Sequence, residues 1–101
     1  MISEESELLM SAISLVEIAI LAEKGRIRIS KELLQRGLES LRVSRLPFRD
    51  RDALRYFSLP ENDQHRDPFD RMLIAQALEE QVPVITSDRR FSRYKGLEVI
   101  W

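Results

Sequence analysis

The feature that most constrains the fold of this chain is a helix start that leads directly into a buried strand, within residues 65–91 (HRDPFDRMLIAQALEEQVPVITSDRRF). Asp67 followed by Pro68 is a strong helix start, because aspartate accepts hydrogen bonds from the first free amides and proline has no amide that needs a partner. The stretch that follows is mostly apolar, and residues 82–86 (VPVIT) have the continuous apolar pattern of a parallel strand covered on both faces. A closely packed helix followed by such a strand predicts an α/β fold.

The rest of the chain alternates in the same way. The expected strands are residues 8–12, 42–46, 82–86 and 97–101, and the expected helices are residues 15–24, 31–41, 50–58, 89–94 and a helix from residue 68. Ser14 and Ser30 are expected to cap the first two helices, and Gly25 is expected to end the first. This order predicts a single three-layer α/β/α domain, residues 1–101, with a central parallel sheet between the helices.

The first three helices carry apolar side chains that are expected to face inward. In the first two helices these residues recur at helical spacing, and in the third they are two large side chains. The expected inward residues are Leu15, Ile18, Ala19, Ala22, Leu33, Leu34, Leu38, Leu41, Leu54 and Phe57.

Composition excludes several classes of protein. The chain has 101 residues, of which 44% are apolar and 33% charged, as in one soluble globular domain. The longest uncharged run, residues 8–16, is too short to cross a membrane and no secretory signal precedes it, so we expect a cytoplasmic protein. The absence of cysteine excludes disulfides and thiolate metal sites. A net charge of −1 gives no overall basic field, although 13 of the 16 basic residues are arginine, which suits phosphate.

Four acidic residues are expected to share one rim of the sheet, because parallel strand ends and the helix starts that follow them lie at the same edge. Glu17 is expected in the first turn of the first helix. Asp67 and Asp70 fall in the first turn of a later helix, and Asp88 directly follows residues 82–86. Clustered carboxylates repel one another, and a divalent cation such as Mg²⁺ would relieve that repulsion.

Each of these acids also has a purely structural explanation. Glu17 is the only charge in residues 8–22, so a buried Glu17 would need a cation, a basic partner or a raised pKa; the alternative is an exposed residue near a helix N-terminus. Asp67 and Asp88 can cap helices, and Asp70 can interact with a helix dipole. Since His65 is the only imidazole, zinc is disfavoured, and His65 is interpreted as a loop residue or a phosphate contact.

The combined motifs resemble a known family. SAISLVEIAI, AEKGRIRI, HRDPFDRMLIAQA and ITSDRRF resemble the PIN domain of VapC-type toxins, and the likeness runs over residues 9–101. It implies a Mg²⁺- or Mn²⁺-dependent endoribonuclease of a type II toxin–antitoxin system, usually homodimeric, which hydrolyses RNA and is inhibited by a cognate antitoxin. The residues that the resemblance places in the site are Glu17, Asp70 and Asp88 as catalytic metal ligands, Asp67 as a further ligand, and Thr86 or Ser87 as hydrogen-bonding groups. The nearby arginines expected to contact RNA or the antitoxin are Arg66, Arg71, Arg89 and Arg90.

One departure from the family is expected to matter. Members open with a strand that ends in a metal-binding aspartate, whereas residues 1–7 (MISEESE) are polar. The resemblance therefore implies a PIN-like fold whose first, central strand is missing from this chain, an N-terminal truncation relative to the family. Unpaired strand edges need partners, so we expect a fragment completed by another piece, a strand-exchanged assembly or a sheet that closes differently.

Three functions are compatible with these observations. A completed site would support metal-assisted phosphodiester hydrolysis, with Glu17 or Asp88 as the general base. The alternative is a catalytically inactive PIN-like binding module, or a fragment that assembles with a partner chain, which the absence of the first strand favours. A receiver-like or phosphatase-like domain would need a phosphoacceptor aspartate after an early strand and a lysine after a late one, and neither is evident.

Overall fold

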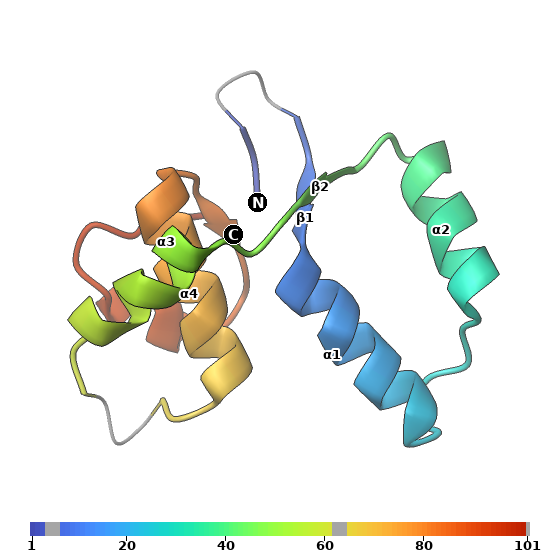
Figure 1. Ribbon diagram of the computed structural model, residues 1–101, viewed down its shortest axis with the longest axis horizontal. Coiled ribbons are helices and arrows are strands. Elements are labelled where there is room, and N and C mark those ends of the chain that lie inside the picture. The colour runs from blue at the N-terminus through green and yellow to red at the C-terminus, as the bar shows by residue number, and fades with distance from the viewer. Residues whose placement is uncertain (4–6, 62–64, 101) are drawn as a thin grey trace.

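The computed structural model describes residues 1–3, 7–61 and 65–100, so the predicted strand end at Trp101 lies outside the described residues. Its strands are β1 (Leu9–Ser11), β2 (Ser44–Leu46), β3 (Val84–Ile85) and β4 (Val99–Ile100). Its helices are α1 (Ala12–Glu23), α2 (Lys31–Ser40), α3 (Asp50–Arg55) and α4 (Pro68–Glu80), with short 3-10 helices η1 (Tyr56–Ser58) and η2 (Arg89–Arg93). This is the predicted order, and Figure 1 shows α1 and α2 to one side of the molecule and α3 and α4 to the other. None of the helices in the described ranges has the length and apolar character needed to span a membrane.

The start of α1 differs from the prediction. Ser11, rather than Ser14, caps this helix, and its Oγ accepts a hydrogen bond from the Ile13 amide at 3.0 Å. The prediction that Ser14 caps the helix is wrong, because β1 ends at Ser11 and the helix begins at the next residue. The helix therefore begins three residues earlier than expected, and Glu17 lies in its second turn instead of its first. Gly25, with a φ of 73°, follows the end of α1 as predicted.

The described strands form two separate parallel pairs, β1 with β2 and β3 with β4. Parallel pairing agrees with the predicted topology, but no pairing joins β1 to β3, so the sheet is interrupted between them in the described part of the chain. The prediction that residues 82–86 are covered on both faces holds for Val84, which is buried, and is wrong for Ile85, which is 40% exposed. A strand paired along one edge only leaves part of its surface open.

The first residues of the chain cover the edge of β1 that faces away from β2. The Met1 ammonium donates a hydrogen bond to the Leu9 carbonyl at 3.1 Å, and the Leu9 amide donates to the Met1 carbonyl at 2.8 Å. Ile2 and Leu8 form an antiparallel bridge beside them. Met1 also packs against the hydrophobic core. Residues 1–3 thus provide partners for backbone groups that would otherwise lack them.

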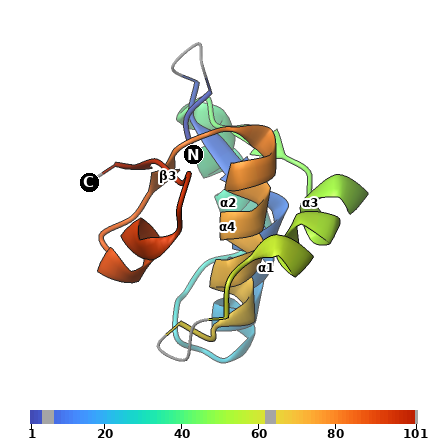
Figure 2. The same cartoon turned by 90° about the vertical axis from the view of Figure 1, so that its left-hand side faces the viewer.

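The core is built around α4. Its buried apolar residues are Leu59, Ile74, Ala75, Ala77, Val84, Phe91 and Tyr94. Figure 2 shows α4 in the middle of this half, with α3 on one side and the segment containing β3 on the other. α3, η1 and the segment from β3 to Tyr94 therefore pack around α4.

The face that α3 and η1 turn inward is not the predicted one. Leu54 and Phe57 were expected to be buried, but they are 64% and 88% exposed, whereas Asp52 is fully buried. Asp52 Oδ2 accepts a hydrogen bond from the Arg49 amide at 2.9 Å and so fixes the first turn of α3. The Asp52 carboxylate thus satisfies the Arg49 amide at the buried position, while the apolar side chains of Leu54 and Phe57 face solvent.

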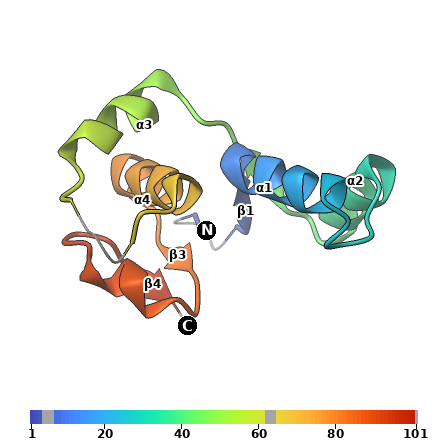
Figure 3. The ribbon, with the colours of Figure 1, turned by 90° about the horizontal axis from the view of Figure 1, so that it is seen from below.

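α1 and α2 form a loosely packed helical hairpin beside the core (Figure 3). Ser30 caps α2 as predicted, since its Oγ accepts a hydrogen bond from the Leu33 amide at 3.0 Å. The two helices line a half-open pocket of about 430 Å³, whose apolar lining includes Leu15, Ile18, Ala19, Ala22, Leu34 and Leu38. Leu33 and Leu41 were predicted to face inward but are 56% and 71% exposed. Among the described residues of α1 and α2, only Leu38 is buried.

Candidate metal centre

The start of α4 positions two of the predicted acidic residues. Asp67 caps the helix, and its Oδ1 accepts hydrogen bonds from the amides of Phe69 at 2.9 Å and Asp70 at 3.4 Å. Pro68 occupies the first helical position, as predicted. Asp67 Oδ1 is therefore used to cap the helix. Asp70 lies in the first turn, where the helix dipole favours a negative charge.

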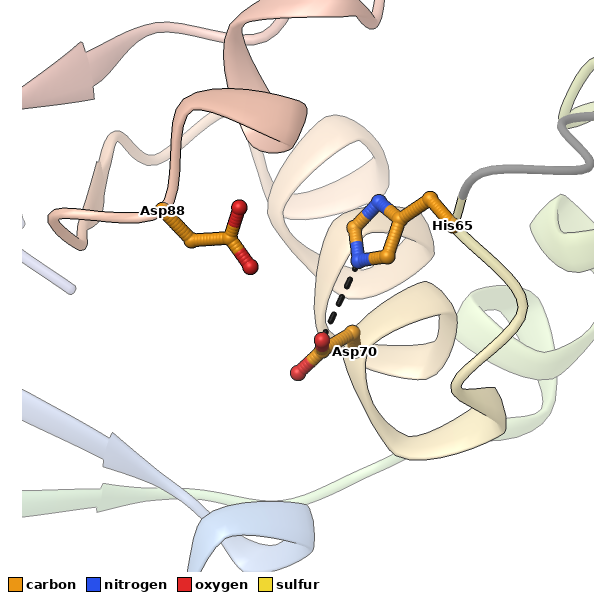
Figure 4. A group of neighbouring side chains, drawn as sticks. All are labelled: His65, Asp70 and Asp88. Atoms are coloured by element: carbon orange, nitrogen blue, oxygen red, sulfur yellow. Dashed lines mark hydrogen bonds and ion pairs between the residues drawn. The ribbon is translucent and has the colours of Figure 1, made fainter.

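Asp70 and Asp88 lie close together, with His65 beside them. Each of the three residues offers one possible ligand atom, and these atoms lie within 4.8 Å of one another. Figure 4 shows the two carboxylates, one from α4 and one from the segment after β3, bordering the same space as the imidazole ring. Chain segments 18 residues apart in sequence thus meet at one point, as the rim argument predicts for Asp70 and Asp88.

Glu17 approaches the same region from α1. Partial burial raises the pKa of the Glu17 carboxyl above its usual value, and the negative charges of Asp70 and Asp67 raise it further. Glu17 is not one of the three residues whose ligand atoms lie within 4.8 Å of each other. The electrostatic interactions of Glu17 place it near Asp67 and Asp70, and Asp70 and Asp88 are the two of these four acids whose ligand atoms lie within 4.8 Å of each other.

Asp88 is held in place from two directions. The Arg90 guanidinium bonds both carboxylate oxygens, with Nη2 2.6 Å from Oδ2 and Nε 3.0 Å from Oδ1, and the Arg90 amide donates to Oδ1 at 3.0 Å. These bonds lower the pKa of Asp88 to about 2, so the carboxylate is ionised at neutral pH. The Thr86 hydroxyl accepts a hydrogen bond from the Asp88 amide at 3.1 Å, whereas Ser87 is exposed.

The four arginines expected to contact RNA or an antitoxin lie in different environments. Arg71 is buried at 9% exposure, and its Nη1 donates to the Pro60 carbonyl at 3.1 Å and to the Tyr94 hydroxyl at 3.0 Å. Its guanidinium also lies 5.3 Å from the centre of the Tyr56 ring. These contacts tie α4 to η1 and to the C-terminal segment, so Arg71 has a structural role and is not available to an external ligand.

The other three arginines are less buried than Arg71. Arg90 binds Asp88, and Arg66 and Arg89 are exposed. Arg66 directly precedes Asp67, and Arg89 directly follows Asp88, so both lie next to acidic residues of the rim. Because their side chains are exposed, Arg66 and Arg89 are better placed than the buried Arg71 to contact a phosphate.

The burial of His65 was not predicted from the sequence. His65 lies in the loop before α4, as interpreted, but it is fully buried and its Nε2 lies 3.1 Å from Asp70 Oδ2. One sequence feature could have indicated this contact. His65 lies two residues before the helix cap, where the chain turns back against the first turn of the helix.

The chain belongs to the PIN domain family, whose sequence profile matches residues 1–97. It is similar in fold to a chain of the structure described as VapBC2 from Rickettsia felis bound to a DNA fragment from their promoter. The TM-score is 0.72 at 22% sequence identity, and the match covers 93% of this chain and 74% of that chain. A search of curated proteins finds no significant match.

The residues at the rim fit a divalent metal ion, on which PIN domains generally depend. The available donors are carboxylate oxygens and one imidazole, a set without the sulfur ligands that soft metals prefer. The raised pKa of Glu17, caused by burial and by the neighbouring carboxylates, is the electrostatic strain that a bound cation would relieve.

Proposed function

We propose that this protein is a VapC-type endoribonuclease toxin that hydrolyses RNA phosphodiester bonds with Mg²⁺ or Mn²⁺. The observation that carries the proposal is the meeting of Asp70 and Asp88, with Glu17 nearby, at the start of α4 in a PIN domain. Three carboxylates that gather against mutual repulsion are suited to a divalent cation, and a phosphodiester is a substrate that such a cation can polarise.

The proposed roles follow from the environment of each residue. Asp70 and Asp88 hold the cation, which when bound polarises the phosphodiester and lowers the pKa of its water. Glu17 is better suited than Asp88 to act as the general base, because burial and neighbouring acids raise its pKa, whereas Arg90 lowers that of Asp88. Thr86 fixes the Asp88 backbone, while Arg66 and Arg89, with the exposed Ser87, border the place where an RNA phosphate would lie.

The proposal includes a partner. The similar structure from Rickettsia felis is described as a VapBC complex bound to promoter DNA, and a cognate antitoxin is the corresponding partner for this chain. A homodimer, which is usual among VapC-type toxins, and a cytoplasmic location, where such toxins meet cellular RNA, belong to the same proposal.

The proposal is tested by RNA cleavage with Mg²⁺ or Mn²⁺ present and after chelation. Asp70→Asn and Asp88→Asn should each reduce the cleavage rate by about 100-fold or more, since even the outer contacts of a metal centre typically contribute about 10–100-fold. Asp50→Asn, which changes an exposed acid at the start of α3, is the matched control and should cleave at the wild-type rate. Unchanged cleavage in both site variants would end the proposal.

One observation favours a second function, that of a PIN-like binding module without catalysis. The Asp88 carboxylate is already neutralised by a short, two-point contact with Arg90, and a cation would have to share it. A module of this kind would bind RNA or an antitoxin with the same affinity before and after chelation, and would cleave nothing. Cleavage that returns on addition of Mn²⁺ excludes this second function.

A further inference from the structure

The imidazole of His65 is the most completely enclosed polar group beside the candidate centre. The residue is fully buried, and its ring packs against two aromatic side chains. The Phe91 ring lies 5.2 Å away at 54°, and the Tyr94 ring lies 5.6 Å away at 70°. The polar contact of His65 in the described part of the chain is that between its Nε2 and Asp70 Oδ2, at 3.1 Å.

We propose that His65 is a positioning residue for the metal centre, an inference that rests on the proposed cation site. His65 Nε2–H donates a hydrogen bond to Asp70 Oδ2, which fixes the rotation of the carboxylate and leaves Oδ1 for the cation. Metal-binding carboxylates are commonly oriented by such outer hydrogen bonds.

The position of the proton on the ring follows from its surroundings. Nδ1 is buried and has no hydrogen-bond partner among the described residues. A proton on Nδ1 would create a buried N–H without an acceptor among the described residues, which is costly, whereas Nε2 faces a carboxylate oxygen. Of the two tautomers, the one with its proton on Nε2 is therefore favoured.

The same argument disfavours His65 as a direct metal ligand. Binding a cation through Nε2 would move the ring proton to Nδ1, and ligating histidines almost always donate that second N–H to an acceptor. No acceptor for Nδ1 is found among the described residues. A hydrogen bond from Nε2–H to Asp70, with Nδ1 unprotonated, agrees with the observed surroundings of both ring nitrogens.

The packing of the ring also links the two carboxylates of the site. Phe91 and Tyr94, which hold the imidazole, belong to the segment that begins at Asp88. Tyr94 is itself fixed by its hydrogen bond from Arg71 in α4. His65 is thus held by the segment that carries Asp88 and in turn holds the carboxylate of Asp70, so it couples the positions of both.

The test uses the full chain and Mn²⁺ as the probe, with the dissociation constant measured by titration calorimetry. His65→Leu should weaken Mn²⁺ binding by about 10–100-fold. His65→Gln should restore most of the affinity, because its amide nitrogen reaches about as far as Nε2. His65→Asn has the same donor on a shorter side chain that cannot reach Asp70, and should bind about tenfold more weakly than His65→Gln.

Gln76→Leu is the control for a purely structural effect. Gln76 is fully buried in α4, and its Nε2 donates to the Pro47 carbonyl at 3.1 Å. This variant should lose thermal stability while keeping its affinity for Mn²⁺.

The outcomes separate this inference from the proposed function. Absence of Mn²⁺ binding by the wild-type chain would overturn the metal centre itself. Wild-type binding that is matched by His65→Leu would overturn only the role of His65. Should His65→Leu fail to fold, as judged by circular dichroism, the comparison of His65→Gln with His65→Asn decides, and equal affinities in that pair would also overturn the inference.

Discussion

The half of the molecule built on α4 and the hairpin formed by α1 and α2 are stabilised very differently. Every member of the hydrophobic core cluster lies between Leu59 and Tyr94, whereas Leu38 is the only buried residue among those of α1 and α2. The candidate centre lies where the two regions meet, with Asp70 and Asp88 from the packed half and Glu17 from α1. The well-packed half therefore supplies two of the proposed metal ligands, and a helix with no buried residue supplies the third acidic group of the candidate centre.

The largest expected difference between the two regions is in the effect of truncating a leucine-sized side chain. Ile74→Ala should lower the free energy of unfolding by about 2–5 kcal/mol, because Ile74 is fully buried and its removal leaves a cavity. Leu33→Ala in α2, where the side chain is 56% exposed, should lower it by about 1 kcal/mol or less. Urea denaturation of both variants measures the two losses, and equal losses would contradict the comparison.

A bound cation should strengthen the contact between the regions. At about 100 times its dissociation constant, Mn²⁺ should raise the free energy of unfolding by about 2.7 kcal/mol, since it binds only the folded chain. Hydrogen exchange with and without Mn²⁺ should show increased protection in α1 and the first turn of α4, and little change in α2. In Asp70→Asn, Mn²⁺ should no longer increase the protection of α1 and α4 from hydrogen exchange. Protection that increases evenly over the chain in that variant would mean that the ion binds elsewhere.

A smaller effect is expected at the contact between α3 and α4. Burial raises the pKa of Asp52, and the nearby Glu80 adds to this, so the folded state prefers the protonated form. The stability that Asp52 contributes is therefore full below its usual pKa of 3.8 and is lost as the pH rises through the folded pKa. Asp52→Asn keeps an acceptor for the Arg49 amide and should gain up to about 1 kcal/mol over wild type as the pH increases. Urea denaturation between pH 4 and 7 measures this gain, and a gain that does not grow with pH would contradict it.

The smallest expected effect concerns Glu17 in the absence of metal. Its raised pKa means that the ionised form destabilises the folded chain, so Glu17→Gln should raise the melting temperature at neutral pH by about 2–5 °C. Glu23→Gln, an exposed position at the end of α1, should leave the melting temperature unchanged. In saturating Mn²⁺ the order should reverse, with Glu17→Gln melting below wild type. A variant that is less stable than wild type under both conditions would mean that Glu17 makes a structural contact instead.

The features that the sequence predicted well depend on neighbouring residues. The start of α4 at Asp67 and Pro68 and the cap of α2 at Ser30 are set by hydrogen bonds within three residues, so residue type is enough to predict them. The meeting of Asp70 and Asp88 follows from chain direction in parallel α/β units, which is also a general rule.

The features that it missed depend on packing between distant segments. Nothing near Leu54 or Phe57 indicates that Asp52 would take the inward position, because that choice depends on how α3 meets α4. The burial of His65 depends in the same way on Phe91 and Tyr94, which lie more than 20 residues further along the chain. The division of the sheet into two pairs depends on which strand edges find partners, and the pattern of any one strand does not contain this information.

The most direct test of the cation site is a titration of the isotope-labelled chain with substoichiometric Mn²⁺, followed by NMR. The paramagnetic ion broadens resonances of nuclei close to it, so the site is located without any assumption about activity. We expect broadening to be strongest around Asp70 and Asp88, to extend to Glu17, and to be weakest in α2. Broadening centred on the exposed acids of α2 or α3, or spread evenly over the acidic surface, would contradict it.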